Sequence, residues 1–183
     1  MEALQSVVYT IDDIYALPDG QRAELIDGII YNMSPPNIRH QYLNTKLASK
    51  IDQYIDTKKG NCMVFSAPFA VFLNADDKTY VEPDISVICD KTKLENGRGC
   101  MGAPDWIIEI VSPSSKRMDY GIKLFKYYDS GVKEYWIVDP LKNKITVYNF
   151  ENETDTEEYS FSDKIKVGIY KDLEIDFSEI TIQ

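Results

Sequence analysis

Two stretches of the sequence, EPDISVI at residues 82–88 and APDWIIEIVSP at residues 103–113, decide the fold. Each has a turn-forming Pro-Asp pair followed by a run of β-branched and apolar residues, a pattern typical of a buried strand. Asp84 lies at the start of one predicted strand, and Glu109 lies in the middle of the other. A carboxylate among isoleucine and valine side chains is costly to bury unless a cation or hydrogen bonds hold it. Two such acids on neighbouring strands therefore predict a site for a hard divalent metal ion.

The sequence on both sides of these stretches predicts further helices and strands. Asp27-Gly28 is a strong hairpin signal, whereas residues 91–102, with three glycines, predict a loop. The fold class is therefore predicted as α/β (α+β), with a central mixed β-sheet flanked by helices, an N-terminal helix and a β-hairpin. Residues 144–150 are expected to close the sheet. Predicted helices cover residues 10–17, 37–58 and 116–130, and predicted strands cover residues 23–26, 29–33, 62–65, 69–73, 85–89, 106–111, 134–138, 144–150, 165–170 and 173–175.

The 183 residues are predicted to form a single domain, because 44% of them are hydrophobic and the length supports one sizeable core. We expect the core at about residues 9–150, an acidic tract at 151–163 and C-terminal strands at 164–183. The net charge of −10 argues against a general nucleic-acid binder. However, the acidic tract holds six acids and no base, and a local basic cluster stands elsewhere, so charge leaves nucleic-acid binding open. That cluster consists of Lys116, Arg117, Lys123 and Lys126.

The three cysteines, Cys62, Cys89 and Cys100, are odd in number and widely spaced. Such a set fits neither a disulfide framework nor a C-x-x-C metal knuckle. We therefore expect reduced thiols and a cytoplasmic protein. No run of the sequence approaches the roughly 18 apolar residues that a membrane span needs, so no membrane association is expected.

Six ordered motifs give the sequence a family resemblance. They are ELIDG at 24–28, a helix with His40, PDI at 83–85, IEIVSPS at 108–114, D-x-x-x-K at 119–123 and GVKEYWIVDP at 131–140. From about residue 9 to residue 148 the chain resembles the Uma-type restriction endonucleases, which belong to the PD-(D/E)XK nuclease superfamily. The resemblance implies a restriction-endonuclease-like core with metal-binding acids on adjacent central strands. It also implies hydrolysis of DNA phosphodiester bonds with Mg²⁺, for which Mn²⁺ can substitute.

The resemblance implies a role for individual residues as well. Asp84 matches the Pro-Asp acid of the superfamily, Glu109 its second acid, and Glu24 an N-terminal acid that often adds a metal ligand. The backbone carbonyl of Ile110 is the natural further ligand because it follows Glu109 on the strand. The superfamily lysine is expected two residues after Glu109, but Val111 stands there. In the Uma-type pattern this lysine moves to the following helix, which here means Lys123, where it would position water or neutralise charge developing on the phosphate.

Each of these residues also has a structural interpretation. Asp84 could cap a turn, and Glu109 could be a structurally paired acid. Lys123 lies in a polar stripe that on most helices is the solvated face, and with Asp119 it could form an ordinary pair worth about 0.3 kcal/mol. On the same helix we predict that the core-facing residues are Met118, Ile122, Leu124, Phe125 and Tyr128.

Three further residues are candidates for contact with the substrate. His40 is the only histidine, which excludes a histidine-based zinc site, and it could contact a phosphate, orient water or pack the helix. Ser114 lies at a predicted helix start, whose free N–H groups are available to a phosphate. Lys126 belongs to the basic cluster.

The sequence thus predicts a metal-dependent endonuclease that hydrolyses DNA, with Asp84, Glu109, Glu24 and Ile110 as metal ligands and Lys123 beside them. By resemblance to restriction-type enzymes, which pair active sites on two strands, we expect a homodimer. An alternative is a catalytically inactive nuclease-fold module that binds DNA or a protein, which the net acidity favours. A glycosidase with Glu109 and Asp84 as its acid pair fits poorly, because no aromatic sugar platform is recognisable.

Overall fold

A six-stranded mixed sheet lies at the centre of the computed structural model, which describes residues 7–151 and 156–180. Strands β7 (Trp106–Ile110) and β8 (Glu134–Asp139) are parallel, and every other neighbouring pair in this sheet is antiparallel. The two Pro-Asp stretches form the neighbours β5 (Ile85–Ile88) and β7, with Ile85 opposite Ile108. In spatial order the strands are β10 (Glu157–Ser160), β9 (Lys144–Asn149), β8 (Glu134–Asp139), β7 (Trp106–Ile110), β5 (Ile85–Ile88) and β3 (Met63–Ser66).

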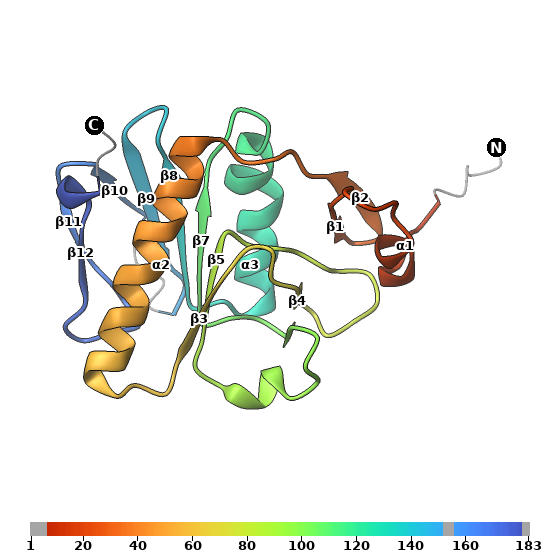
Figure 1. Cartoon of the computed structure of the whole chain (residues 1–183), viewed down its shortest axis with the longest axis horizontal. Coiled ribbons are helices and arrows are strands. Elements are labelled where there is room, and N and C mark those ends of the chain that lie inside the picture. Colours follow the sequence, from red (N-terminus) through yellow and green to blue (C-terminus); the bar gives the residue numbers. More distant parts are fainter. Residues whose placement is uncertain (1–6, 152–155, 181–183) are drawn as a thin grey trace.

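Helices cover both faces of this sheet, with α2 (Ile38–Lys58) on one side and α3 (Lys123–Ser130) on the other (Figure 1). Side chains alternate along β7, so Ile108 packs in one core cluster with α2, whereas Ile107 packs in the other with α3. The α2 side also carries the C-terminal strands β11 (Lys164–Lys166) and β12 (Glu174–Asp176), which pair antiparallel. The predicted fold class, a central mixed sheet flanked by helices, is therefore confirmed.

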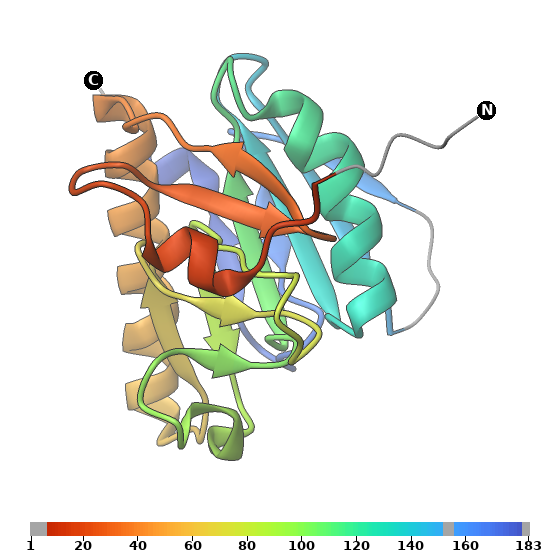
Figure 2. The ribbon, with the colours of Figure 1, turned by 90° about the vertical axis from the view of Figure 1, so that its right-hand side faces the viewer.

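The N-terminal elements lie over the same face as α3 (Figure 2). They are α1 (Ile11–Tyr15) and the hairpin of β1 (Ala23–Ile26) and β2 (Ile29–Asn32). Asp27 and Gly28 both have positive φ, as expected for a two-residue hairpin turn, and a Cβ on Gly28 would lie 2.4 Å from the side chain of Val8. Backbone hydrogen bonds between Leu25 and Tyr80 tie the hairpin to the chain that enters β5. The neighbour of Leu25 in β1, Glu24, is thereby held close to the start of β5.

Several segments differ from the sequence-based prediction. Residues 91–102 are not a plain loop, because they form the 3₁₀-helix η1 (Lys91–Leu94) and β6 (Cys100–Met101), which pairs parallel with β4 (Val71–Phe72). The strand at residues 144–149 does not close the sheet either. Strand β10, from the acidic tract, pairs with the outer side of β9 and is the edge strand. This pairing is possible because Lys144 neutralises Glu158 and Tyr159 packs against the core. Residues 152–155 of the tract lie outside the described ranges.

The predicted helix at 116–130 begins with a π-helical segment, η2 (Met118–Ile122), before α3. Such segments are rare and often occur at functional sites. Phe125 and Tyr128, predicted to face the core, are 62% and 55% exposed, whereas Asp119 and Lys123 from the polar stripe are buried. Met118, Ile122 and Leu124 pack against the core as predicted. The prediction was wrong for Phe125 and Tyr128 because it assigned the inner face by hydrophobicity, and the buried side of this helix also faces polar groups.

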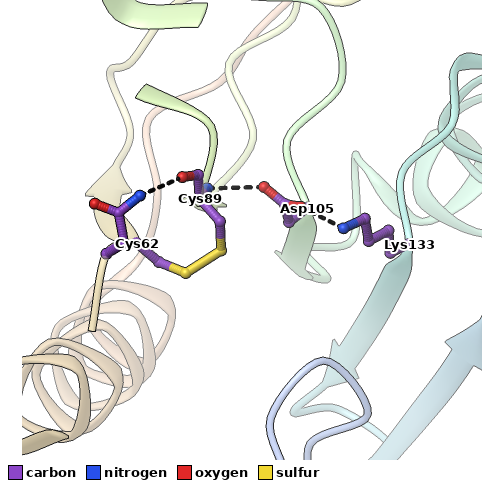
Figure 3. Close-up of a disulfide and its surroundings, with 5 residues drawn as sticks. Cys62, Cys89, Asp105 and Lys133 are labelled. Carbon is purple, nitrogen blue, oxygen red and sulfur yellow. Dashed lines mark hydrogen bonds and ion pairs between the residues drawn. A yellow bond between two sulfur atoms is a disulfide. The ribbon is translucent and has the colours of Figure 1, made fainter. Parts of the chain in front are cut away.

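Cys62 and Cys89 form a disulfide, so the expectation of reduced thiols is wrong for this pair (Figure 3). The two residues are far apart in sequence, but they directly flank the paired residues Met63 and Ile88 of β3 and β5. Pairing of the two strands therefore brings them together. Cys100 stays a buried free thiol, whose pKa burial raises to about 11.

The disulfide removes the argument from cysteine spacing for a reducing compartment, because disulfides are rare in the cytosol. A cytoplasmic location therefore stays a prediction. None of the helices within residues 7–151 and 156–180 is long and apolar enough to cross a membrane.

The disulfide is expected to stabilise the fold measurably. Its two cysteines are 27 residues apart, and a loop of that size corresponds to about 2–4 kcal/mol through restriction of the unfolded chain. Adding dithiothreitol should lower the free energy of unfolding by that amount in urea titrations. The double variant Cys62→Ser/Cys89→Ser is the control, because its unfolding should be indifferent to the reductant. An unfolding curve of the natural chain that does not move with reductant would contradict the expectation.

Candidate functional site

A cavity of about 380 Å³ opens where β5 begins and β7 ends. Its walls come from the N-terminal hairpin, the start of α2, the ends of the two central strands, and the segment that leads into α3. Every one of the acids predicted as metal ligands lines it, together with the predicted lysine. The charged residues of the wall are Arg22, Glu24, His40, Glu82, Asp84, Glu109, Asp119 and Lys123.

Asp84 and Glu109 lie next to each other through the pairing of β5 with β7. The backbone N–H of Ile110 donates to Asp84 Oδ2 at 2.7 Å, and the N–H of Asp84 faces Glu109 Oε2 at 3.3 Å. Asn44 of α2 donates to the carbonyl oxygen of Asp84 at 2.8 Å, which fixes the chain at this point. The paired strands therefore hold the carboxylate of each of these two residues against a backbone N–H group of the other strand.

Lys123 connects Glu109 with Glu24 of the N-terminal hairpin. Its Nζ lies 2.9 Å from Glu109 Oε1 and 2.8 Å from Glu24 Oε1. The side chains of all three residues are buried, with 6% or less of each exposed. Glu24 Oε1 also accepts from the N–H of Glu82 at 3.0 Å. Lys123 is thus not on a solvated face, and its ion pairs join residues 99 and 14 positions away in the sequence instead of a neighbour on its own helix.

The cavity holds more negative charge than Lys123 neutralises. Burial raises the pKa of Glu109 well above its usual range; Lys123 opposes this shift, and Asp84, Asp119 and Glu24 add to it. Burial alone would lower the pKa of Lys123, but Glu109 and Glu24 outweigh it and hold that pKa well above its usual value. Burial also raises the pKa of Asp119 to about 6. The Lys123 ammonium therefore stays charged, and the carboxylates that it does not neutralise favour the binding of a proton or of a further cation.

Two residues of this cluster had no predicted role at the site. Tyr127 is fully buried and donates its hydroxyl to Glu109 Oε1 at 2.6 Å. It stands one helical turn after Lys123, and that i,i+4 spacing was the signal that could have identified it. Asp119 accepts from the Ser115 hydroxyl at 2.6 Å, and its other oxygen, Oδ1, is buried with no hydrogen-bond partner in the described structure. A buried carboxylate oxygen without a partner is costly and fits a site completed by a cation or water.

The three candidates for substrate contact lie in different places. His40 lines the cavity with Nε2 at 3.0 Å from Asp84 Oδ2; burial lowers its pKa, but the hydrogen bond and the charge of Asp84 outweigh burial and raise it. Ser114 is exposed at the cavity wall and its hydroxyl contacts that of Ser112. Lys126 instead forms an ion pair with Asp27 and does not line the cavity. The structure therefore brings His40 and Ser114 to the site, and it leaves Lys126 outside.

A divalent cation fits the donor set of the cavity. Carboxylate and carbonyl oxygens are the ligands that Mg²⁺ and Mn²⁺ prefer, and the surplus negative charge and the orphaned Asp119 oxygen both favour a cation. Among the residues that the structure describes, no three His, Cys, Asp or Glu side chains already form a metal-ligand group. The position of Lys123 between Glu24 and Glu109 accounts for this, since the ammonium holds one oxygen of each carboxylate.

Replacing Lys123 tests how far the cluster depends on its single ammonium. Lys123→Met should lower the free energy of unfolding by about 3–5 kcal/mol, because it leaves buried carboxylates without their counter-charge. Addition of Mn²⁺ should return part of this loss, since a cation that binds the folded state stabilises it. Urea titrations with and without Mn²⁺ measure both effects.

Lys126→Met is the matched control, because Lys126 lies on the same helix but pairs with the exposed Asp27. Its cost should stay below about 1 kcal/mol. Equal losses for the two variants would show that Lys123 is no more than a surface ion-pair partner.

Comparison with known proteins agrees with this architecture. A crystal structure described as "a putative nuclease belonging to DUF820 from Anabaena variabilis ATCC 29413" is 21% identical in sequence, with a TM-score of 0.75 over 93% of this chain and 96% of that one. At this identity the likeness shows the fold alone. No curated protein matches the chain. The model of the Uma2 family, described as "Putative restriction endonuclease", matches residues 11–178. Because this match covers most of the chain, the protein belongs to the Uma2 family.

Proposed function

We propose that this protein is a metal-dependent endonuclease that hydrolyses phosphodiester bonds of DNA. One observation carries the proposal: Glu24, Asp84 and Glu109, from three separate parts of the chain, converge with the buried Lys123 on one cavity. Lys123 pairs with only two of these acids, and a buried site with more acid than base is costly unless a further cation binds there. Membership of a family described as restriction endonucleases supports the same function.

Asp84, Glu109, Glu24 and the carbonyl of Ile110 would hold the Mg²⁺ or Mn²⁺ ion. When bound, such an ion lowers the pKa of a water molecule and polarises the phosphoryl oxygen. The protein supplies what surrounds that chemistry: the paired strands fix Asp84 and Glu109, and the hydroxyl of Tyr127 fixes the orientation of Glu109.

Lys123 and His40 are two groups of the site that can donate hydrogen bonds into the cavity. The Lys123 ammonium donates hydrogen bonds inside the cavity and can neutralise charge that develops on the phosphate. His40 holds Asp84 from the α2 side and presents a titratable ring to the cavity, in place to contact the substrate or orient water. Ser114, at the wall, is suited to a phosphate oxygen. A homodimer with paired active sites and a cytoplasmic location belong to this proposal.

Cleavage assays with plasmid and linear DNA test the proposal directly. Cutting is expected with Mg²⁺ or Mn²⁺ and not with EDTA, and Asp84→Ala and Glu109→Ala should abolish it, because each removes a carboxylate that holds the ion. Calorimetric titration with Mn²⁺ should show binding to the natural chain and its loss in both variants.

Asp105→Asn provides a matched control within the same sequence pattern. Asp105 also follows a proline before a central strand, but it lies at the other end of β7, where it accepts from the Cys89 N–H and pairs with Lys133 (Figure 3). This variant should cut like the natural chain. Undiminished cutting by the Glu109→Ala protein would reject the proposal, and the absence of Mn²⁺ binding to the natural chain would favour the non-catalytic nuclease-fold module.

A further inference from the structure

One edge of the molecule is built from segments that carry basic side chains and contain no acid of their own, although the chain has a net charge of −10. Three segments form it: residues 34–41 at the start of α2, residues 112–118 before α3, and residues 140–144 between β8 and β9. None of the three contains Asp or Glu. Their exposed bases, here called the basic edge, are Arg39, Lys116, Arg117 and Lys142.

Side-chain contacts join these segments into one surface. Arg39 Nη2 donates to Asn143 Oδ1 at 3.1 Å, which ties the start of α2 to the β8–β9 turn. Lys144 of the same turn lies 5.8 Å from the ring centre of Tyr120, which ties it to η2. Figure 1 shows the three segments together at the upper end of the molecule. Residues of the first two segments also line the cavity, so the basic edge borders its mouth.

The bases of the edge differ from half of the sixteen other bases in the described residues, which form ion pairs with acidic side chains. Lys50, Lys58, Lys133 and Lys164 each form an ion pair with an acidic side chain. Within residues 7–151 and 156–180, none of the four bases of the edge does so. Asp139, the acid next to the turn, is 1% exposed and accepts backbone N–H groups of that turn, so it does not cancel the charge. Nor does Glu158 of β10, which is paired with Lys144.

We propose that the basic edge is the surface that receives the phosphate backbone of duplex DNA. Exposed bases without acidic partners are what counter-ion release at a polyanion requires, and the rest of the acidic surface would repel DNA, so this edge directs it to the cavity. The three segments contain no Phe, Tyr or Trp, and the two rings that their bases contact, Phe161 under Arg39 and Tyr120 under Lys144, are half-buried. Surfaces that bind single strands use such rings for base stacking, so this edge fits the backbone of a duplex instead.

Fluorescence anisotropy with a labelled 30-base-pair duplex in EDTA tests this directly, because binding is then measured without cutting. The charge reversal Arg39→Glu/Lys116→Glu/Arg117→Glu/Lys142→Glu should weaken binding by about tenfold or more at 100 mM salt. The slope of log affinity against log salt should become shallower by about 3 to 4, since each phosphate contact contributes about 0.9.

A second variant with the same change in net charge is the control. Lys78→Glu/Lys91→Glu/Arg98→Glu/Lys171→Glu reverses four exposed bases away from the edge. This variant should bind the duplex more tightly than the edge variant does, and its salt slope should equal that of the natural chain. Circular-dichroism melting checks that both variants are folded. Equal losses in the two variants would overturn the proposal, and so would an edge variant that binds like the natural chain. Tighter binding of single-stranded DNA or of duplex RNA than of duplex DNA would overturn the choice of partner.

The proposal rests on the proposed function for its choice of DNA, but its failure is distinguishable. Duplex binding that is lost in the edge variant, by a protein that never cuts, would retain the surface and reject the nuclease. Metal-dependent cutting that is unaffected in the edge variant would retain the nuclease and reject the surface.

Discussion

A single buried ammonium among several carboxylates is the interaction on which the site depends. Lys123 pairs with Glu109 and Glu24, and Asp119 and Asp84 stand close enough to raise the pKa of Glu109 further. Removal of charged groups from water is costly, and a cluster with surplus acid stays folded only because the surrounding core is large and the hydrogen bonds are many. Such uncompensated negative charge lowers the stability of the fold and favours the binding of a cation. The surplus charge therefore supports a functional role for this cluster.

The sheet and its two helical layers bring together the distant parts of the chain that form this cluster. β5 and β7 supply Asp84 and Glu109, α3 supplies Lys123 and Tyr127, and the hairpin of β1 and β2 lies over that face to supply Glu24. The hairpin is tied to the start of β5 by main-chain hydrogen bonds, so Glu24 is fixed by backbone geometry. The site is thus assembled at the end of the central strands, where chain segments from both layers meet.

The same tertiary arrangement sorts the charges at the surface. A basic cluster visible in the sequence, residues 116–126, separates into two exposed bases, one buried lysine and one lysine paired with Asp27. The two exposed bases join Arg39 and Lys142, which no sequence pattern associates with them. The acidic chain thereby has a basic edge beside its cavity. The net charge of the whole sequence does not reveal this edge.

The sequence by itself determined the central strands, the hairpin at Asp27-Gly28, the long helix and the acids of the site. These features rest on local rules: turn residues, alternation, helical period, and the cost of an acid inside an apolar run. Only the tertiary structure decided the disulfide, the pairing of β10, the inward face of the polar stripe on α3 and the role of Tyr127. Each depends on partners distant in the sequence. Cys62 meets Cys89 through strand pairing, and Lys123 can be buried because Glu24 and Glu109 form ion pairs with it.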